Sequence, residues 1–129
     1  MIIDSSAIVA IALLEPAAPS LLDRIEKAAF RRLSVANYVE TASVLASRRV
    51  TASMLDDLLA DLGVELYPFD EKQAREAVRA RVAYGKGTGH RAQLNFGDTF
   101  AYALAKVSQE PLLFIGDDFT HTDIALVEL

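Results

Sequence analysis

The sequence has 129 residues, 52% hydrophobic and 24% charged, with a net charge of −5. This balance is typical of globular proteins and excludes intrinsic disorder, and the length predicts a single domain over residues 1–129. Cysteine is absent, which excludes disulfide scaffolds, zinc–thiolate sites and thiol catalysis. Because no apolar stretch approaches the roughly 18 residues of a membrane span and the first residues do not resemble a secretory signal, we expect a soluble, cytoplasmic protein without a membrane partner.

Short apolar runs alternate with amphipathic segments along the chain. The first half predicts, in order, a strand before Asp4, a buried helix over 7–14 capped by Ser5 or Ser6, a helix over 19–30, a strand over 33–35, and helices over 37–48 and 52–62. The second half predicts a strand over 64–67, a charged helix from the cap Asp70 to Tyr84, a glycine-rich loop over 85–89, a helix over 98–109, and strands over 112–115 and 124–127. This alternation predicts an α/β fold with a parallel sheet and helices on both faces.

Four acidic residues stand at positions where such a fold binds ligands. Asp4 directly follows the first predicted strand, and Asp117 follows the strand over 112–115. Ligands of open α/β sheets bind outside the carboxyl ends of the strands. Asp98 begins a helix, and Glu40 lies within a helix of apolar and small residues, where an unpaired carboxylate facing the core would be costly.

Each acid also has a purely structural explanation. Asp4 and Asp98 can cap helices, Glu40 can face solvent, and Asp117 with Asp118 can form a turn. Together these explanations weaken, because several carboxylates at one sheet edge repel one another unless a cation neutralises them. Oxygen ligands without histidine or cysteine suit Mg²⁺ or Mn²⁺, and clustered carboxylates around such ions are typical of phosphate chemistry.

Four segments then make a specific family resemblance. They are Met1–Ala7, Tyr38–Glu40, Leu94–Ala105, and Leu113–Phe119 with Thr122–Ile124. In this order and spacing the chain resembles PIN-domain proteins and, more narrowly, VapC-type toxins of bacterial toxin–antitoxin pairs. The resemblance implies a PIN-like three-layer α/β fold, with a central parallel sheet flanked by helices. It also implies an endoribonuclease that hydrolyses RNA phosphodiester bonds with Mg²⁺ (or Mn²⁺) and is neutralised by a small VapB-like antitoxin.

The resemblance assigns the family's acidic quartet to Asp4, Glu40, Asp98 and Asp117, as both metal ligands and catalytic residues. For the last of these, the adjacent Asp118 is the alternative.

Supporting roles fall on residues near these acids. We expect Lys86 and Arg91, in the loop before the helix that Asp98 begins, to guide the RNA backbone. We expect Ser6 or Thr99 to orient the metal ligands. Arg91 departs from the proline expected there in this subgroup, which leaves the conformation of that loop open.

The helices carry more apolar residues than a small globule needs, since the mean hydropathy is +0.22. The helix over 52–62 has Leu55, Leu58, Leu59 and Leu62 on one stripe, with Met54 beside them. That stripe can simply belong to the protein's own core. With the resemblance, however, it predicts a homodimer that binds a small antitoxin. A non-catalytic PIN-like interaction module is the alternative function.

Overall fold

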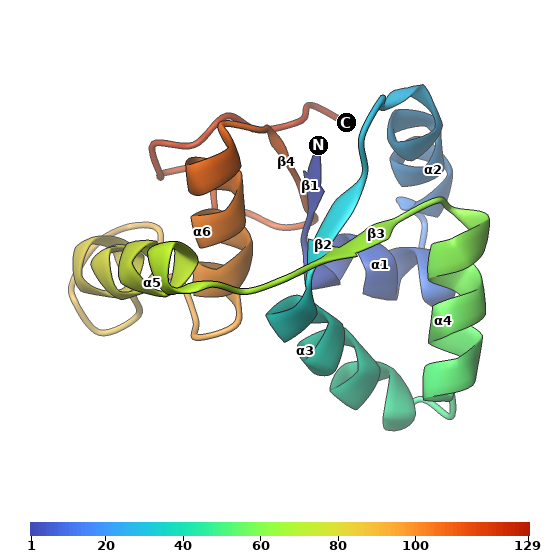
Figure 1. Ribbon diagram of the computed structural model, residues 1–129. Helices are drawn as coiled ribbons and strands as arrows, with labels where there is room; N and C mark the ends of the chain where they lie inside the picture. The colour runs from blue at the N-terminus through green and yellow to red at the C-terminus, as the bar shows by residue number, and fades with distance from the viewer.

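The computed structural model describes residues 1–129, and its centre is a four-stranded sheet (Figure 1). The strands are β1 (Ile2–Ile3), β2 (Arg32–Ser34), β3 (Glu65–Tyr67) and β4 (Leu112–Leu113). They lie in the order β3-β2-β1-β4 and every neighbouring pair is parallel, with Ile2 opposite both Arg32 and Leu112. The predicted parallel α/β sheet is therefore confirmed.

Six helices enclose the sheet. They are α1 (Ser5–Ala12), α2 (Ala18–Lys27), α3 (Val35–Ala46), α4 (Ala52–Asp61), α5 (Glu71–Tyr84) and α6 (Asp98–Ser108). In Figure 1, α5 and α6 stand on one side of the strands, and α1, α2 and α4 stand on the other, with α3 below. This arrangement confirms the expected three layers.

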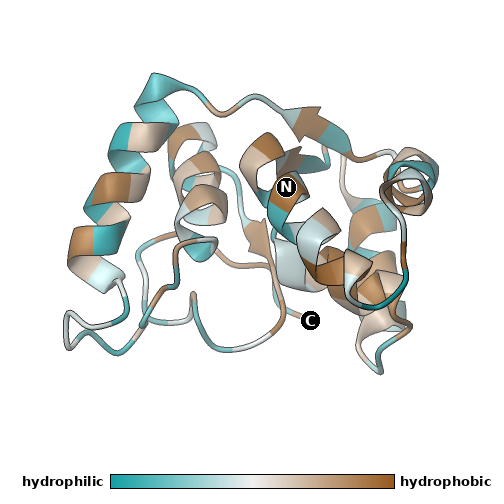
Figure 2. Ribbon diagram, turned by 90° about the horizontal axis from the view of Figure 1, so that it is seen from below, coloured by the Kyte–Doolittle hydropathy of each residue, from teal (hydrophilic) through white to brown (hydrophobic).

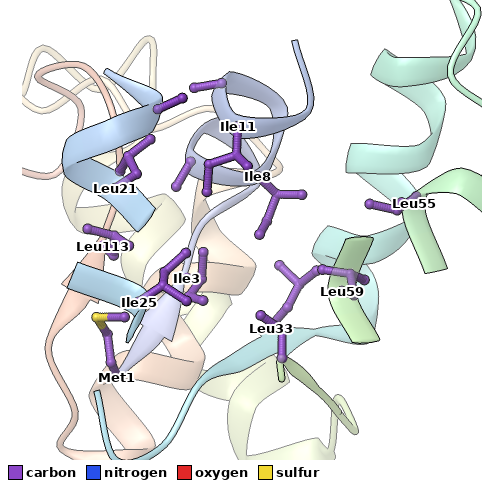
Figure 3. Close-up of a cluster of buried hydrophobic side chains, with 14 of the residues drawn as sticks. Met1, Ile3, Ile8, Ile11, Leu21, Ile25, Leu33, Leu55, Leu59 and Leu113 are labelled. Carbon is purple, nitrogen blue, oxygen red and sulfur yellow. The ribbon is translucent and has the colours of Figure 1, made fainter. Parts of the chain in front are cut away.

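Two hydrophobic cores lie on opposite faces of the sheet, because successive strand residues point to opposite sides. Ile3 and Leu113 belong to the larger core with residues of α1 to α4. Figure 3 shows these two strand residues together with side chains of α1, α2 and α4. Ile2 and Leu112 instead join the second core, with residues of α5 and α6. Both faces of β1 and β4 are thus buried, as expected for central parallel strands.

The structure corrects three boundaries. Asp4, and neither Ser5 nor Ser6, is the N-cap of α1, because its carboxylate accepts the Ser6 N–H. Val35 begins α3 instead of ending a strand, because the Ser34 hydroxyl accepts the Ala36 N–H and starts the helix there. The segment over 124–127 forms only an isolated parallel bridge to β4, and no strand.

The leucine stripe of α4 faces the core only in part. Leu55 and Leu59 are buried, Leu58 and Leu62 are half-buried against the same core, and Met54 is exposed. The stripe therefore serves mainly the protein's own core. None of the helices is both long and apolar enough to cross a membrane.

Candidate functional site

Three of the four predicted acids, Asp4, Glu40 and Asp98, come together at the carboxyl ends of the central strands. Asp4 directly follows β1, and its backbone N–H donates to the Leu113 carbonyl of β4. Helix α3 starts immediately after β2 and carries Glu40 on its second turn. Asp98 is the first residue of α6, which packs against both β1 and β2. The parallel topology thus assembles acids that are far apart in the sequence.

Glu40 is fixed by hydrogen bonds at one carboxylate oxygen. Its Oε2 accepts the Ser5 hydroxyl at 2.6 Å and the Asn37 side-chain amide at 3.0 Å. The same Asn37 Nδ2 also donates to the Gly97 carbonyl at 3.0 Å, so Asn37 links the α3 acid to the start of α6. A Cβ at position 97 would overlap the Glu40 carboxylate, which explains the glycine there.

Asp98 and Asn95 hold each other in a reciprocal pair. Asp98 Oδ2 accepts the Asn95 N–H at 2.8 Å, and Asn95 Oδ1 accepts the Asp98 N–H at 2.9 Å. This pattern satisfies backbone donors at the helix start in the manner of a capping box. The Asp98 carboxylate is thereby fixed at the N-terminus of α6, where the helix dipole favours negative charge.

Burial raises the pKa of both aspartates. Asp4 is 4% exposed, and desolvation lifts its pKa from 3.8 to about 6, against the lowering effect of the Ser6 hydrogen bonds and with a smaller contribution from the Glu40 charge. Asp98 is 7% exposed, and desolvation lifts its pKa to about 7, helped by the charges of Asp4, Asp118 and Glu40. A cation at this position would relieve both effects.

The turn after β4 presents two further acids. Asp118, and not Asp117, is among the charges that raise the pKa of Asp98, and its carboxylate lies beside Gly116. Both aspartates are exposed, and the Asp117 carbonyl accepts the N–H and the hydroxyl of Thr120, which closes a turn. Asp123 lies apart from the cluster, since it accepts hydrogen bonds from Tyr102 and Lys106.

The two hydroxyl residues expected to orient ligands bind the backbone around the acids. Ser6 donates its N–H to Asp4, and its hydroxyl oxygen accepts the Ile115 N–H at 3.0 Å, which ties α1 to the end of β4. The Thr99 hydroxyl donates to the Phe96 carbonyl at 2.6 Å and fixes the loop before Asp98.

The two predicted RNA-contacting residues lie in the loop that joins α5 to α6. Lys86 and Arg91 are both exposed and form no ion pair. The loop around Arg91 is ordered by His90, whose Nδ1 accepts the Ala92 N–H and whose ring packs edge-on against Tyr84.

Sequence reasoning missed three polar residues of the site: Ser5, Asn37 and Asn95. Asn37 lies three residues before Glu40, and Asn95 three residues before Asp98, and this spacing places side chains together on a helix or at its N-terminus. The spacing was thus a usable signal for the local pairs. The Ser5–Glu40 contact joins residues 35 positions apart, and no local pattern predicts it.

The donor set fits a hard divalent cation. Asp4 Oδ1 is a buried oxygen without a hydrogen-bond partner, and so is Oδ1 of Asn37, the residue whose side-chain nitrogen binds Glu40. No group of three or more acidic or histidine side chains forms a ready-made metal cage. Mg²⁺, however, keeps several waters and uses only one or two carboxylates. The unsatisfied oxygens and the two buried aspartates meet that requirement.

Comparison with known proteins agrees with this architecture. Residues 1–125 match the PIN domain family. Ribonuclease VapC42 of Mycobacterium tuberculosis is 48% identical over 126 residues, which cover 96% of both chains. Among solved structures, the M. tuberculosis toxin VapC20, described as cleaving the sarcin–ricin loop, superposes with a TM-score of 0.76 at 15% identity over 99% of this chain and 98% of that one.

A toxin–antitoxin complex from Klebsiella pneumoniae gives a TM-score of 0.72 at 15% identity, over 98% of this chain and 95% of that one. Identity this low supports the fold alone, whereas 48% over nearly the whole length supports common family membership. The match to the family profile and the high-identity relative confirm the resemblance inferred from the sequence motifs. The chain belongs to the PIN domain family, among the VapC ribonucleases.

Proposed function

We propose that this chain, as a single PIN domain over residues 1–129, is a metal-dependent endoribonuclease and the toxin of a toxin–antitoxin pair. The observation that carries the proposal is the pair of buried aspartates, Asp4 and Asp98, whose charges are destabilised by burial and meet no cation of the protein. Such an arrangement is costly for stability and is typical of functional sites. The VapC relatives support RNA as the substrate.

Asp4 and Asp98 are the residues that would hold Mg²⁺ or Mn²⁺, with Glu40 completing the site directly or through water. The acid turn after β4 contributes a fourth carboxylate, and the electrostatic effect on Asp98 favours Asp118 over Asp117 in that role. A divalent cation supplies Lewis acidity in such a site: it offsets charge on the phosphate and makes water a better nucleophile.

The protein's own residues would prepare the site before substrate arrives. Ser5 and Asn37 hold the Glu40 carboxylate in one orientation, and Asn95 does the same for Asp98. Fixed ligands need no reorganisation during the reaction, which is how preorganised polar sites lower a barrier. Lys86 and Arg91, exposed at the loop before α6, would attract the phosphate backbone of RNA.

We further propose a cytoplasmic homodimer that is neutralised by a small antitoxin. Three exposed apolar side chains lie beside the larger core and offer a surface for such a protein partner: Leu14 in the turn after α1, Leu22 on α2 and Met54 on α4. The antitoxin would suppress cleavage by covering the acidic edge.

The decisive test is RNA cleavage by purified protein with Mg²⁺ or Mn²⁺, compared with the same reaction in EDTA. Asp98→Asn keeps the shape of the side chain but removes its charge, so it should abolish cleavage and leave the fold intact. Asp118→Asn should lower the rate more than Asp117→Asn. If the wild type cleaves no RNA with either metal but still binds its antitoxin, the protein is a non-catalytic interaction module.

A further inference from the structure

An apolar groove lies next to the acidic site, between α5 and the start of α6. Its volume is about 290 Å³. Its lining includes Phe69, Val78, Arg81, Val82, Phe96 and Phe100. Phe96 is 74% exposed, and Val78 and Val82 on α5 are 64% and 72% exposed. In Figure 2 the ribbon of α5, the helix at the left, is largely hydrophilic but contains hydrophobic segments.

Three phenylalanines form the aromatic part of the groove. The Phe96 and Phe100 rings meet edge to face with centroids 4.9 Å apart, and the Phe100 and Phe69 rings do the same at 5.1 Å. Phe100 therefore supports the Phe96 ring from one side, while most of that ring stays open to solvent. A supported and exposed aromatic ring is a stacking surface for another flat ring.

The backbone fixes this ring relative to the acids. Phe96 lies two residues before Asp98, and its carbonyl accepts the Thr99 hydroxyl at 2.6 Å. The adjacent Gly97 is held from the other side by Asn37, the residue that also binds Glu40. A molecule stacked on Phe96 would therefore lie at a defined position beside the acidic cluster.

The rim of the groove carries positive charge. Arg81 Nη1 donates to the Lys86 carbonyl at 2.9 Å, and neither cation forms an ion pair with a carboxylate. The neighbouring arginines of α5 differ, since Arg75 pairs with Glu71 and Arg79 pairs with Glu76. In a protein with a net charge of −5, free cations at this rim favour a polyanion.

We propose that this groove binds an unpaired base of the RNA substrate, next to the bond that is cut. The base stacks on Phe96, and Arg81 contacts a neighbouring phosphate. The proposal rests on the ribonuclease function proposed above. A second copy of the chain could also cover an apolar surface, but the aromatic wall, the free cations and the continuity with Asp98 favour single-stranded RNA.

Binding is measured in the Asp98→Asn background, so that the RNA stays intact. The probes are a short single-stranded RNA that spans a site cut by the wild type, and the same RNA with abasic nucleotides beside that site. Phe96→Ala should weaken binding of the normal RNA by about 5- to 150-fold, the range that loss of one stacked base gives. It should not change binding of the abasic RNA, and Phe96→Trp should retain affinity for the normal RNA.

Two further variants keep the test independent of folding. Phe30→Ala removes another exposed phenylalanine, at the opposite end of β2, and should leave RNA affinity unchanged. Arg81→Gln should reduce the slope of log affinity against log salt by about 0.7, the value for one phosphate contact on a single strand.

The proposal would be overturned if Phe96→Ala, made in the Asp98→Asn background, bound the normal RNA with the same affinity as Asp98→Asn alone. An equal loss on both RNAs would also overturn it, as would conversion of a dimer to a monomer by Phe96→Ala in sedimentation, which would assign the groove to a second copy. Failure of the ribonuclease function itself gives a different result, because the wild type would then cut no RNA.

Discussion

Replacing Asp4 by asparagine should stabilise the metal-free protein while removing its nuclease activity. Burial raises the pKa of Asp4 from 3.8 to about 6. At about 1.4 kcal/mol per pKa unit, this difference corresponds to about 3 kcal/mol of unfolding free energy, which is the most that removing the charge can restore. Asparagine keeps an oxygen that can accept the Ser6 N–H, so the cap of α1 is retained.

The stabilisation should depend on pH with a defined sign. The carboxyl of Asp4 titrates near 3.8 when unfolded and near 6 when folded, so the folded state binds more protons between these values. The contribution of the Asp4 carboxyl to the free energy of unfolding is therefore fully present below pH 3.8 and is lost as the pH rises through about 6. The advantage of Asp4→Asn should appear above this window and vanish below it.

Denaturation in EDTA at pH 8 and at about pH 4 measures this difference. For a chain of 129 residues, 1 kcal/mol changes the melting temperature by about 4 °C, so the gain at pH 8 is at most about 12 °C. Asp70→Asn is the matched control, because Asp70 also caps a helix but is exposed and is not among the charges that raise the pKa of Asp4 or Asp98. No gain for Asp4→Asn, or a gain equal to that of the control, would refute the electrostatic reasoning.

Three other predictions concern the same cluster. Mn²⁺ should raise the melting temperature more at pH 8 than at pH 5, because protons compete with the metal for the buried carboxylates. Scanning fluorimetry measures this rise, and it should find none in a variant with Asp4 and Asp98 both changed to asparagine. Asn37→Ala removes the side chain that links Glu40 to Gly97, so it should lower the free energy of unfolding in urea by about 1–3 kcal/mol and also lower the cleavage rate. An unchanged cleavage rate would contradict the orienting role of Asn37. Gly97→Ala places a Cβ against the Glu40 carboxylate and should reduce cleavage in a steady-state assay, and a fully active variant would show that Glu40 need not keep this position.

The sequence was sufficient to predict the parallel sheet and the acids at its edge. Short apolar strands alternate with helices, and an acid such as Asp4 directly after a buried strand points to the ligand-binding edge. The predicted helix and strand boundaries that were wrong lie where one residue has two roles. Asp4 is both a cap and a member of the cluster, and Ser34 ends β2 while it caps α3.

The contacts that hold the acidic side chains in place could not be predicted from the sequence, because they depend on tertiary packing. The Ser5 hydroxyl reaches Glu40 only after α1 has packed against α3. Which of Asp117 and Asp118 acts on Asp98 depends on how the turn after β4 is folded, and two adjacent identical residues carry no sequence pattern that separates them. The apolar groove likewise forms only when the loop before α6 closes on α5.

We propose that the acidic edge of the sheet holds the catalytic cation, and diffraction from crystals soaked in Mn²⁺ can locate that ion. An anomalous peak is expected at the carboxylates of Asp4 and Asp98 in the wild type, and none in Asp98→Asn, the variant expected not to cleave RNA. A peak elsewhere on the surface, or an unchanged peak in that variant, would contradict it.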